Sequence, residues 1–356
     1  MAVSALRRLA ASAPPSVFAA IGEGGRAQVE AVFAAGRVVP AKSPRHASIL
    51  LVAGAIRDAD AAALARVHDQ LPHPRASVVC GDAPSHALPE PVRADTEAIE
   101  DAITATHRAL VRGERASARD ILADEPPAPW KGEGDHGQGG EGMMGGVPYG
   151  RPMAMTDDDV RDGLALDAYR ATYGPFLPTM PPGLALDLTL QGDVIVAARV
   201  IAAPYAEPPA ATPEAARRRI ARLARLMGLA PQADRLLRGE RPHASFVART
   251  GMMKAIPEGL GATAPGDDVR ARLRTWIAAL EGGEKAIPPP AEGPKLVDLL
   301  IGLEWFEAML VINSFHDATL REMTPADPPD GDHDAAHQHG GHGHAHHGHH
   351  QHEGHA

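Results

Sequence analysis

The chain has 356 residues, 44% hydrophobic but only 4% aromatic, which is enough for two domains with cores of aliphatic side chains. Its formal charge of −10 with histidine neutral argues against a general nucleic-acid binder. The single cysteine, Cys80, excludes an internal disulfide and any iron–sulfur cluster held by four cysteines of this chain, and it is consistent with a reducing compartment.

No targeting or membrane segment is expected. The first residues, "MAVSALRRLAASAPPSVFAAIGEG", lack the sustained apolar core of a secretory signal. No apolar run approaches the roughly 20 residues of a membrane span. We therefore predict a cytoplasmic protein without a transmembrane segment, at most peripheral on the inner face of the membrane.

The first third of the chain predicts an α/β domain. A helix is expected over 27–35, followed by a strand in "ASILLVAG" (47–54), a helix in "DADAAALARVHDQL" (58–71) and a strand in "RASVVCGD" (75–82). Another helix is expected over 94–114. A strand–helix–strand order favours parallel pairing, so we predict a short flavodoxin-like parallel sheet.

Residues 125–155 are too rich in Gly and Pro to hold regular structure. Two interpretations stay open, a mobile linker and a loop that docks a partner or lines a pocket. In the second interpretation, Tyr149 and Arg151 are candidate cofactor-binding anchors. The loop contains no nucleotide-binding fingerprint in a strand–helix context.

The region after this loop predicts a β-hairpin and then helices. Alternate leucines in "LALDLTL" (184–190) lie on one face, and Gln191-Gly192 is suited to the turn of a hairpin over 184–201. Helices are expected over 212–228, from Asp267 or Asp268 onward, and over "KLVDLLIGLEWFEAMLVINSF" (295–315), which should be central to the core.

Two segments resemble neighbouring subunits of respiratory complex I and of membrane-bound nickel–iron hydrogenases. "HASILLVAGAIRDADAAALARVHDQLPHPRASVVCGDA" (46–83) resembles the core of the small, cluster-bearing subunit. "GPFLPTMPPGLALDLTLQGDV" (174–194) resembles the start of the large, quinone-site subunit. The two segments span 38 and 21 of the 356 residues. The resemblance implies a small-subunit-like domain over 1–124, the connecting loop, and a large-subunit-like, mainly helical domain over 156–325.

The small-subunit resemblance places a degenerate cluster site at Cys80, Gly81 and Asp82. That family continues its strand into Gly-Ser-Cys, whose thiolate binds iron, whereas here the ligand position falls on Ala83. Because the family's other cysteines have no counterpart, no self-contained 4Fe–4S cluster is expected. The alternative for Cys80 is a small core residue at a strand end.

The segment that resembles the large subunit also lacks the histidines and cysteines that carry that family's chemistry. Two histidines that the family is thought to place around the quinone headgroup are replaced by Leu177 and by Pro181 or its neighbour. The nickel-binding cysteine pairs of true hydrogenases are absent. We therefore assign no catalytic residue, and whether the chain is an enzyme stays open.

The helix "EAARRRIARLARLMG" carries five arginines, and two interpretations are open: a solvated face of a core helix, or contact with an anionic subunit or lipid surface. The five are Arg217, Arg218, Arg219, Arg222 and Arg225.

The last 24 residues hold 11 of the 19 histidines, in a Gly/Ala tract expected to be disordered within a tail over 326–356. Closely spaced imidazoles can bind Ni²⁺ or Zn²⁺, and an inert solubilising tail is the alternative. The candidate metal ligands are His333, His337, His339, His342, His344, His346, His347, His349, His350, His352 and His355.

Three functional hypotheses follow. The first is a relative of complex I and hydrogenase subunits that has lost its cluster and quinone ligands and acts in assembly or structure of a hydrogenase-like or complex I-like redox complex. The second is an active quinone- or metal-linked oxidoreductase subunit that uses a partner's clusters. The third is nickel or zinc storage or delivery through the tail.

Overall fold

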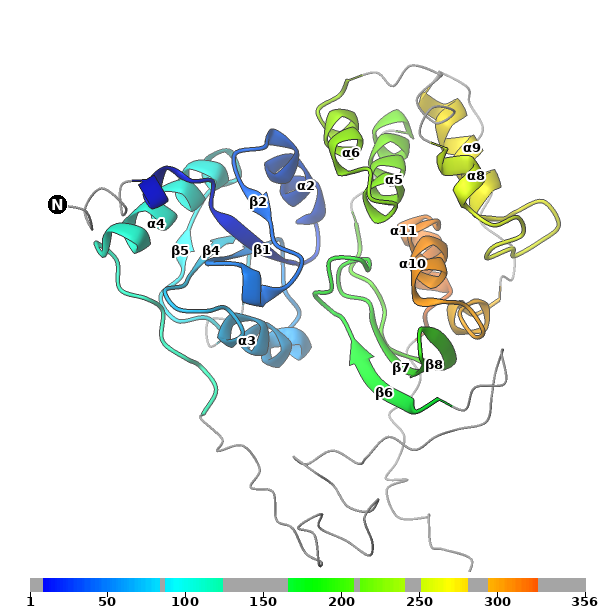
Figure 1. Cartoon of the computed structure of the whole chain (residues 1–356), viewed down its shortest axis with the longest axis horizontal. Coiled ribbons are helices and arrows are strands. Elements are labelled where there is room, and N and C mark those ends of the chain that lie inside the picture. Colours follow the sequence, from blue (N-terminus) through cyan, green and yellow to red (C-terminus); the bar gives the residue numbers. More distant parts are fainter. Residues whose placement is uncertain are drawn as a thin grey trace, which may run out of the picture. The chain divides into compact units, whose positions relative to one another are not determined.

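The computed structural model describes residues 9–83, 87–123, 166–207, 212–240, 251–280 and 294–325. All of these residues belong to one compact unit. The described part confirms the α/β prediction. It contains a five-stranded parallel sheet, a three-stranded antiparallel sheet and a set of helices that follow it (Figure 1).

The parallel sheet has the strand order β2-β1-β3-β4-β5, which is the flavodoxin-like order predicted from the strand–helix–strand pattern. Its strands are β1 (Ser16–Ile21), β2 (Val39–Pro40), β3 (Ile49–Ala53), β4 (Ala76–Cys80) and β5 (Val92–Arg93). Strands β3 and β4 are buried along their whole length, as expected of strands covered on both faces. Strand β1 lies between β2 and β3 and was not predicted.

Helices cover both faces of this sheet. They are α2 (Arg26–Ala35), α3 (Ala61–Asp69) and α4 (Ile99–Arg112). One buried cluster joins α2 and α4 to the face that carries Val17, Leu51 and Val78. Another joins α3 to the opposite face, through Leu50 and Leu64. Figure 1 shows the same division, with α2 and α4 on one side of the strands and α3 on the other.

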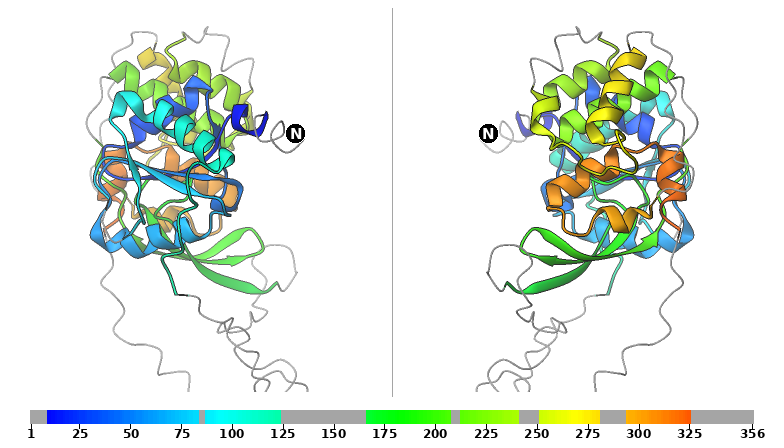
Figure 2. Two further views of the ribbon diagram at one scale, coloured as in Figure 1. Left: turned by 90° about the vertical axis from the view of Figure 1, so that its left-hand side faces the viewer. Right: turned by 90° about the vertical axis from the view of Figure 1, so that its right-hand side faces the viewer.

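The antiparallel sheet contains the predicted hairpin. Its strands are β6 (Ala168–Tyr173), β7 (Ala185–Gln191) and β8 (Val194–Ala202), in that order (Figure 2). The turn uses Gly192 and Asp193, and Gly192 has a positive φ of 63°. Leu184, Leu186 and Leu188 are fully buried, as their alternation predicts. Strand β6, which pairs with β7, was not predicted.

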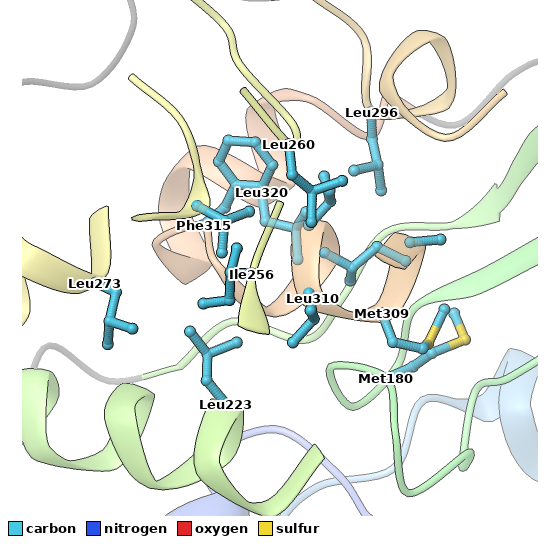
Figure 3. Packing of buried hydrophobic residues seen from close by; sticks show 14 of the residues in the cluster. Met180, Leu223, Ile256, Leu260, Leu273, Leu296, Met309, Leu310, Phe315 and Leu320 are labelled. Atoms are coloured by element: carbon cyan, nitrogen blue, oxygen red, sulfur yellow. The ribbon is translucent and has the colours of Figure 1, made fainter. Parts of the chain in front are cut away.

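The helices after the hairpin share one hydrophobic core with it. They are α5 (Thr212–Leu226), α6 (Ala230–Leu237), α8 (Met252–Ala255), α9 (Val269–Leu280), α10 (Trp305–Asn313) and α11 (Asp317–Glu322). Leu223 of α5, Leu273 of α9 and Leu310 of α10 belong to this core (Figure 3). Helix α5 begins at Thr212 as predicted, and Gly228 follows it with a left-handed backbone.

The prediction of one helix over 295–315 is wrong. A short 3-10 turn, Leu296–Leu299, is followed by Gly302 at a φ of 84°. Glu304 then starts α10 through a reciprocal capping box with Glu307. The left-handed glycine and this new helix start interrupt an apolar run that is otherwise suited to a continuous helix. Over the described ranges, no helix is both long and apolar enough to cross a membrane.

Candidate functional site

Open parallel sheets bind ligands outside the carboxyl ends of their strands, where the strand order reverses. Here that point lies between β1 and β3, at the loops 22–25 and 54–57. These loops hydrogen-bond to each other. The Glu23 N–H donates to Ala55 O over 2.8 Å, and the Ala55 N–H donates to Glu23 O over 3.0 Å. The Gly22 N–H donates to Ala53 O over 2.7 Å.

Glycines allow these loops to pack directly against one another. A Cβ on Gly25 would lie 2.1 Å from Ala53 O, and one on Gly81 would lie 2.5 Å from Gly54 O. The Gly54 N–H also donates to Cys80 O over 2.9 Å. Because these N–H groups already have backbone acceptors, the loops do not present them as an anion cradle of the kind that binds dinucleotides.

Cys80, Gly81 and Asp82, the predicted degenerate cluster site, lie together at this carboxyl edge. Cys80 is buried, and its Sγ lies 3.9 Å from Gln28 Oε1 and 3.7 Å from Thr96 Oγ1. The exposed Asp82 accepts a backbone hydrogen bond from the Ile56 N–H over 2.9 Å. These are the contacts expected of a small core residue at a strand end.

The two segments that carry the family resemblance meet beside this edge. Arg57 follows β3, and its guanidinium donates to Gly183 O over 2.7 Å and to Ala203 O over 2.9 Å. Arg57 also pairs with Asp60 over 2.8 Å and lies over the Tyr205 ring, 4.3 Å from its centroid. Tyr205 donates to Asp60 Oδ2 over 2.5 Å. Burial and this Asp60 partner raise the pKa of Tyr205, so the phenol stays protonated.

The Pro-rich segment before β7 contributes side chains to two hydrophobic clusters, the one beneath α3 and the one shared by the later helices. Phe176 is buried among residues of β3 and α3, whereas Leu177 packs against the core of the later helices. The Asn313 amide of α10 donates to Thr179 O over 2.9 Å. The resemblance aligns the family's two histidines with Leu177 and with Pro181 or its neighbour. Leu177 is partly buried and Pro181 and Pro182 are buried, so these are packing residues here.

A network of charged side chains links α2 to α5 and α11. The Arg222 Nε donates to Glu30 Oε1 over 2.7 Å, and its Nη1 lies 3.8 Å from Asp317 Oδ1. Arg26 lies 3.5 Å from Glu30 and 3.6 Å from Asp317. Arg219 lies 3.6 Å from Asp317. Sequence reasoning identified the arginines of α5 but not these partners.

Burial shifts the pKa of three groups in or beside the network, whereas the opposite charges around Arg222 and Asp317 outweigh their burial. Burial lowers the pKa of Arg26 to about 10, with the neighbouring Arg222 adding to the effect. Burial raises the pKa of Glu207, which precedes α5, to about 7 despite the nearby arginines. It lowers the pKa of His316 to about 4, with Arg219 acting in the same direction. Near neutral pH, His316 is therefore uncharged and Glu207 is close to its midpoint.

The structure corrects the interpretation of the arginine-rich helix as a solvated face. Side chains of Arg219 and Arg222 are only 11% and 14% exposed. The acidic groups that they contact are Glu30 and Asp317 of the chain itself. Arg225 pairs with Asp234 of α6. Arg219 and Arg222 of α5 thus serve internal packing between distant segments.

The remaining predicted site residues lie outside the described residues. They are the loop anchors Tyr149 and Arg151 and all eleven histidines of the tail. Within the described ranges, no group of three or more His, Cys, Asp or Glu side chains is arranged to hold a metal ion.

No family model matches the chain, and comparison with curated proteins and with solved structures gives no match either. The family resemblance therefore depends on the two sequence segments alone.

Proposed function

We propose that the chain is a structural or assembly component of a hydrogenase-like or complex I-like redox complex, and that it contributes no iron–sulfur cluster of its own. The proposal starts from the resemblance of 46–83 and 174–194 to two neighbouring subunits. The part of the proposal that concerns the missing cluster starts from the residues that stand at the family's ligand positions.

The observation that carries the proposal is the internal closure of the carboxyl edge of the parallel sheet. The loops after β1 and β3 hydrogen-bond to each other, and the Cys80 thiol is buried beside Gln28 and Thr96. The family's cluster-ligand position is Ala83, whose side chain offers no donor atom to iron. This edge is therefore suited to holding the chain together rather than to carrying electrons.

A second feature favours a structural role. Arg57, Asp60 and Tyr205 join the small-subunit-like segment to the large-subunit-like segment within one chain. A fusion would fix, by covalent connection and buried hydrogen bonds, an arrangement that the family obtains by association of two subunits. Such a piece is suited to serve as a scaffold for other subunits.

The test uses cells that lack this gene and carry either the wild-type chain or Cys80→Ala. The amount of the assembled redox complex is measured on native gels, and its quinone or hydrogen activity is measured in membranes. We expect Cys80→Ala to restore both to wild-type levels, because the thiol has no ligand role, and the empty strain to lose the assembled complex.

Full assembly with lost activity in Cys80→Ala would contradict the proposal, because it would assign the thiol a redox role. Normal assembly and activity without the gene would contradict it equally. Thermal unfolding of purified Cys80→Ala serves as the folding control, and loss of one buried sulfur should change stability by no more than about 1–2 kcal/mol.

A further inference from the structure

The charged network that links α2, α5 and α11 contains more guanidiniums than carboxylates paired with them. Three guanidiniums lie in it, those of Arg26, Arg219 and Arg222, and all are at most 14% exposed. The paired carboxylates are Glu30 and Asp317. Arg218, at its margin, lies 4.0 Å from Glu30 but has a carboxylate partner of its own in Glu214, so this pair leaves the charge balance of the network unchanged. Glu207 is thus the group whose protonation state sets whether the network is balanced.

The charges that act on the Glu207 carboxyl come from three elements of the network: Arg26 and Glu30 of α2, Arg222 of α5 and Asp317 of α11. Its Oε1 is buried and has no hydrogen-bond partner among the described residues. When Glu207 is ionised, three carboxylates balance three guanidiniums. When it is protonated, one positive charge stays buried without compensation, which is an unfavourable state.

Two buried N–H donors beside the network have no acceptor among the described residues. They are Nε of Arg219 and Nε1 of Trp276, on α5 and α9. The Arg219 guanidinium lies 5.9 Å from the Trp276 ring centroid, and His316 meets that ring edge-on at 6.5 Å. Trp276 is 2% exposed, so bulk water does not satisfy its donor. The His316 Nε2 is also buried without a partner.

We propose that this junction binds a small inorganic anion, a halide or an oxyanion such as phosphate, through the N–H groups of Arg219 and Trp276, and that the anion is taken up together with a proton on Glu207. An acceptor within reach of both N–H groups would satisfy both donors. A water molecule would satisfy them as well, but only an anion also compensates the charge left when Glu207 is neutral. The inference is independent of any redox or assembly role.

The experiment is thermal unfolding of the full chain at about pH 6 and about pH 8.5, with chloride or phosphate exchanged for gluconate at constant ionic strength. At the lower pH, an anion at ten times its Kd should raise Tm by about 3–6 °C. At the higher pH the shift should nearly vanish, because ionised Glu207 supplies the missing charge.

Three variants and one control separate this site from general salt effects. Glu207→Gln is expected to show the anion-dependent shift at both pH values, whereas Glu240→Gln, an exposed carboxylate outside the network, should behave as wild type. Trp276→Phe keeps an aromatic ring and removes the donor, so its shift at pH 6 should fall at least about twofold. Arg219→Gln should abolish the shift.

The absence of any anion-specific shift at pH 6 would overturn the proposal and assign the two donors to buried water. Equal shifts in all variants and at both pH values would overturn it as well. If Arg219→Gln does not fold, Glu207→Gln and Trp276→Phe still provide the test. Line broadening of the chloride-35 NMR signal gives an independent readout of binding at pH 6.

Discussion

Replacing Arg222 by methionine is expected to lower the free energy of unfolding by about 3–5 kcal/mol. Arg222 is 14% exposed and donates to Glu30 over 2.7 Å, with Asp317 at 3.8 Å. Methionine keeps most of the side-chain volume but removes the charge. Glu30 would then lose the guanidinium that donates to it, and the loss of this buried, charge-assisted hydrogen bond accounts for the expected change.

Urea denaturation followed by circular dichroism measures the change. The matched control is Arg235→Met on α6, where the arginine is 68% exposed and lies 3.9 Å from Glu240. That change should stay within about 0.5 kcal/mol. If Arg222→Met were as stable as the control, the network would contribute nothing to the link between α2 and the later helices.

Replacing Gly174 by alanine is expected to cost at least about 3 kcal/mol. Gly174 has a φ of 100°, a conformation that L side chains rarely adopt, and a Cβ there would lie 2.0 Å from Leu184 O. The loop that follows is closed by the Gly183 N–H, which donates to Pro175 O over 3.0 Å. The added methyl group would force this segment away from β7 and pull Phe176 out of its cluster.

The control for this change is Gly228→Ala. Gly228 also has a positive φ, of 80°, but nothing lies within 4 Å of a Cβ placed there. It should lose only the backbone preference, about 1 kcal/mol. Thermal unfolding of both variants separates conformational strain from close contact. Equal losses in the two would show that the contact with Leu184 does not matter.

Much of the fold could be predicted because its elements carry local signals. Strands β3 and β4 are short apolar runs that end at Gly54 and Gly81, and the helix between them is amphipathic. Strand β1 was missed because "SVFAAI" contains two alanines and follows an Ala-rich start, which weakens its strand pattern even though Pro14 and Pro15 precede it. Its identity depends on parallel pairing with β3, which is set by contacts distant in the sequence.

The charged network could not be predicted in the same way. Arg222 and Glu30 are separated by 192 positions, and Asp317 lies on a third helix. The local sequence shows five arginines on one helix, and it predicts that they face solvent or contact an external partner. The one usable signal was their spacing: Arg219 and Arg222 occupy the helix next to the buried Ile220 and Leu223. Which acidic groups they meet depends on the tertiary fold.

The central claim is that the chain keeps the framework of a redox subunit without a cluster of its own. The most direct test measures iron and acid-labile sulfide in the full chain purified under strictly anaerobic conditions. Sulfide is the deciding quantity, because imidazoles of the tail could retain metal ions without it. The account predicts sulfide far below one per chain and no cluster signal by electron paramagnetic resonance. About four sulfides and four irons per chain would contradict it.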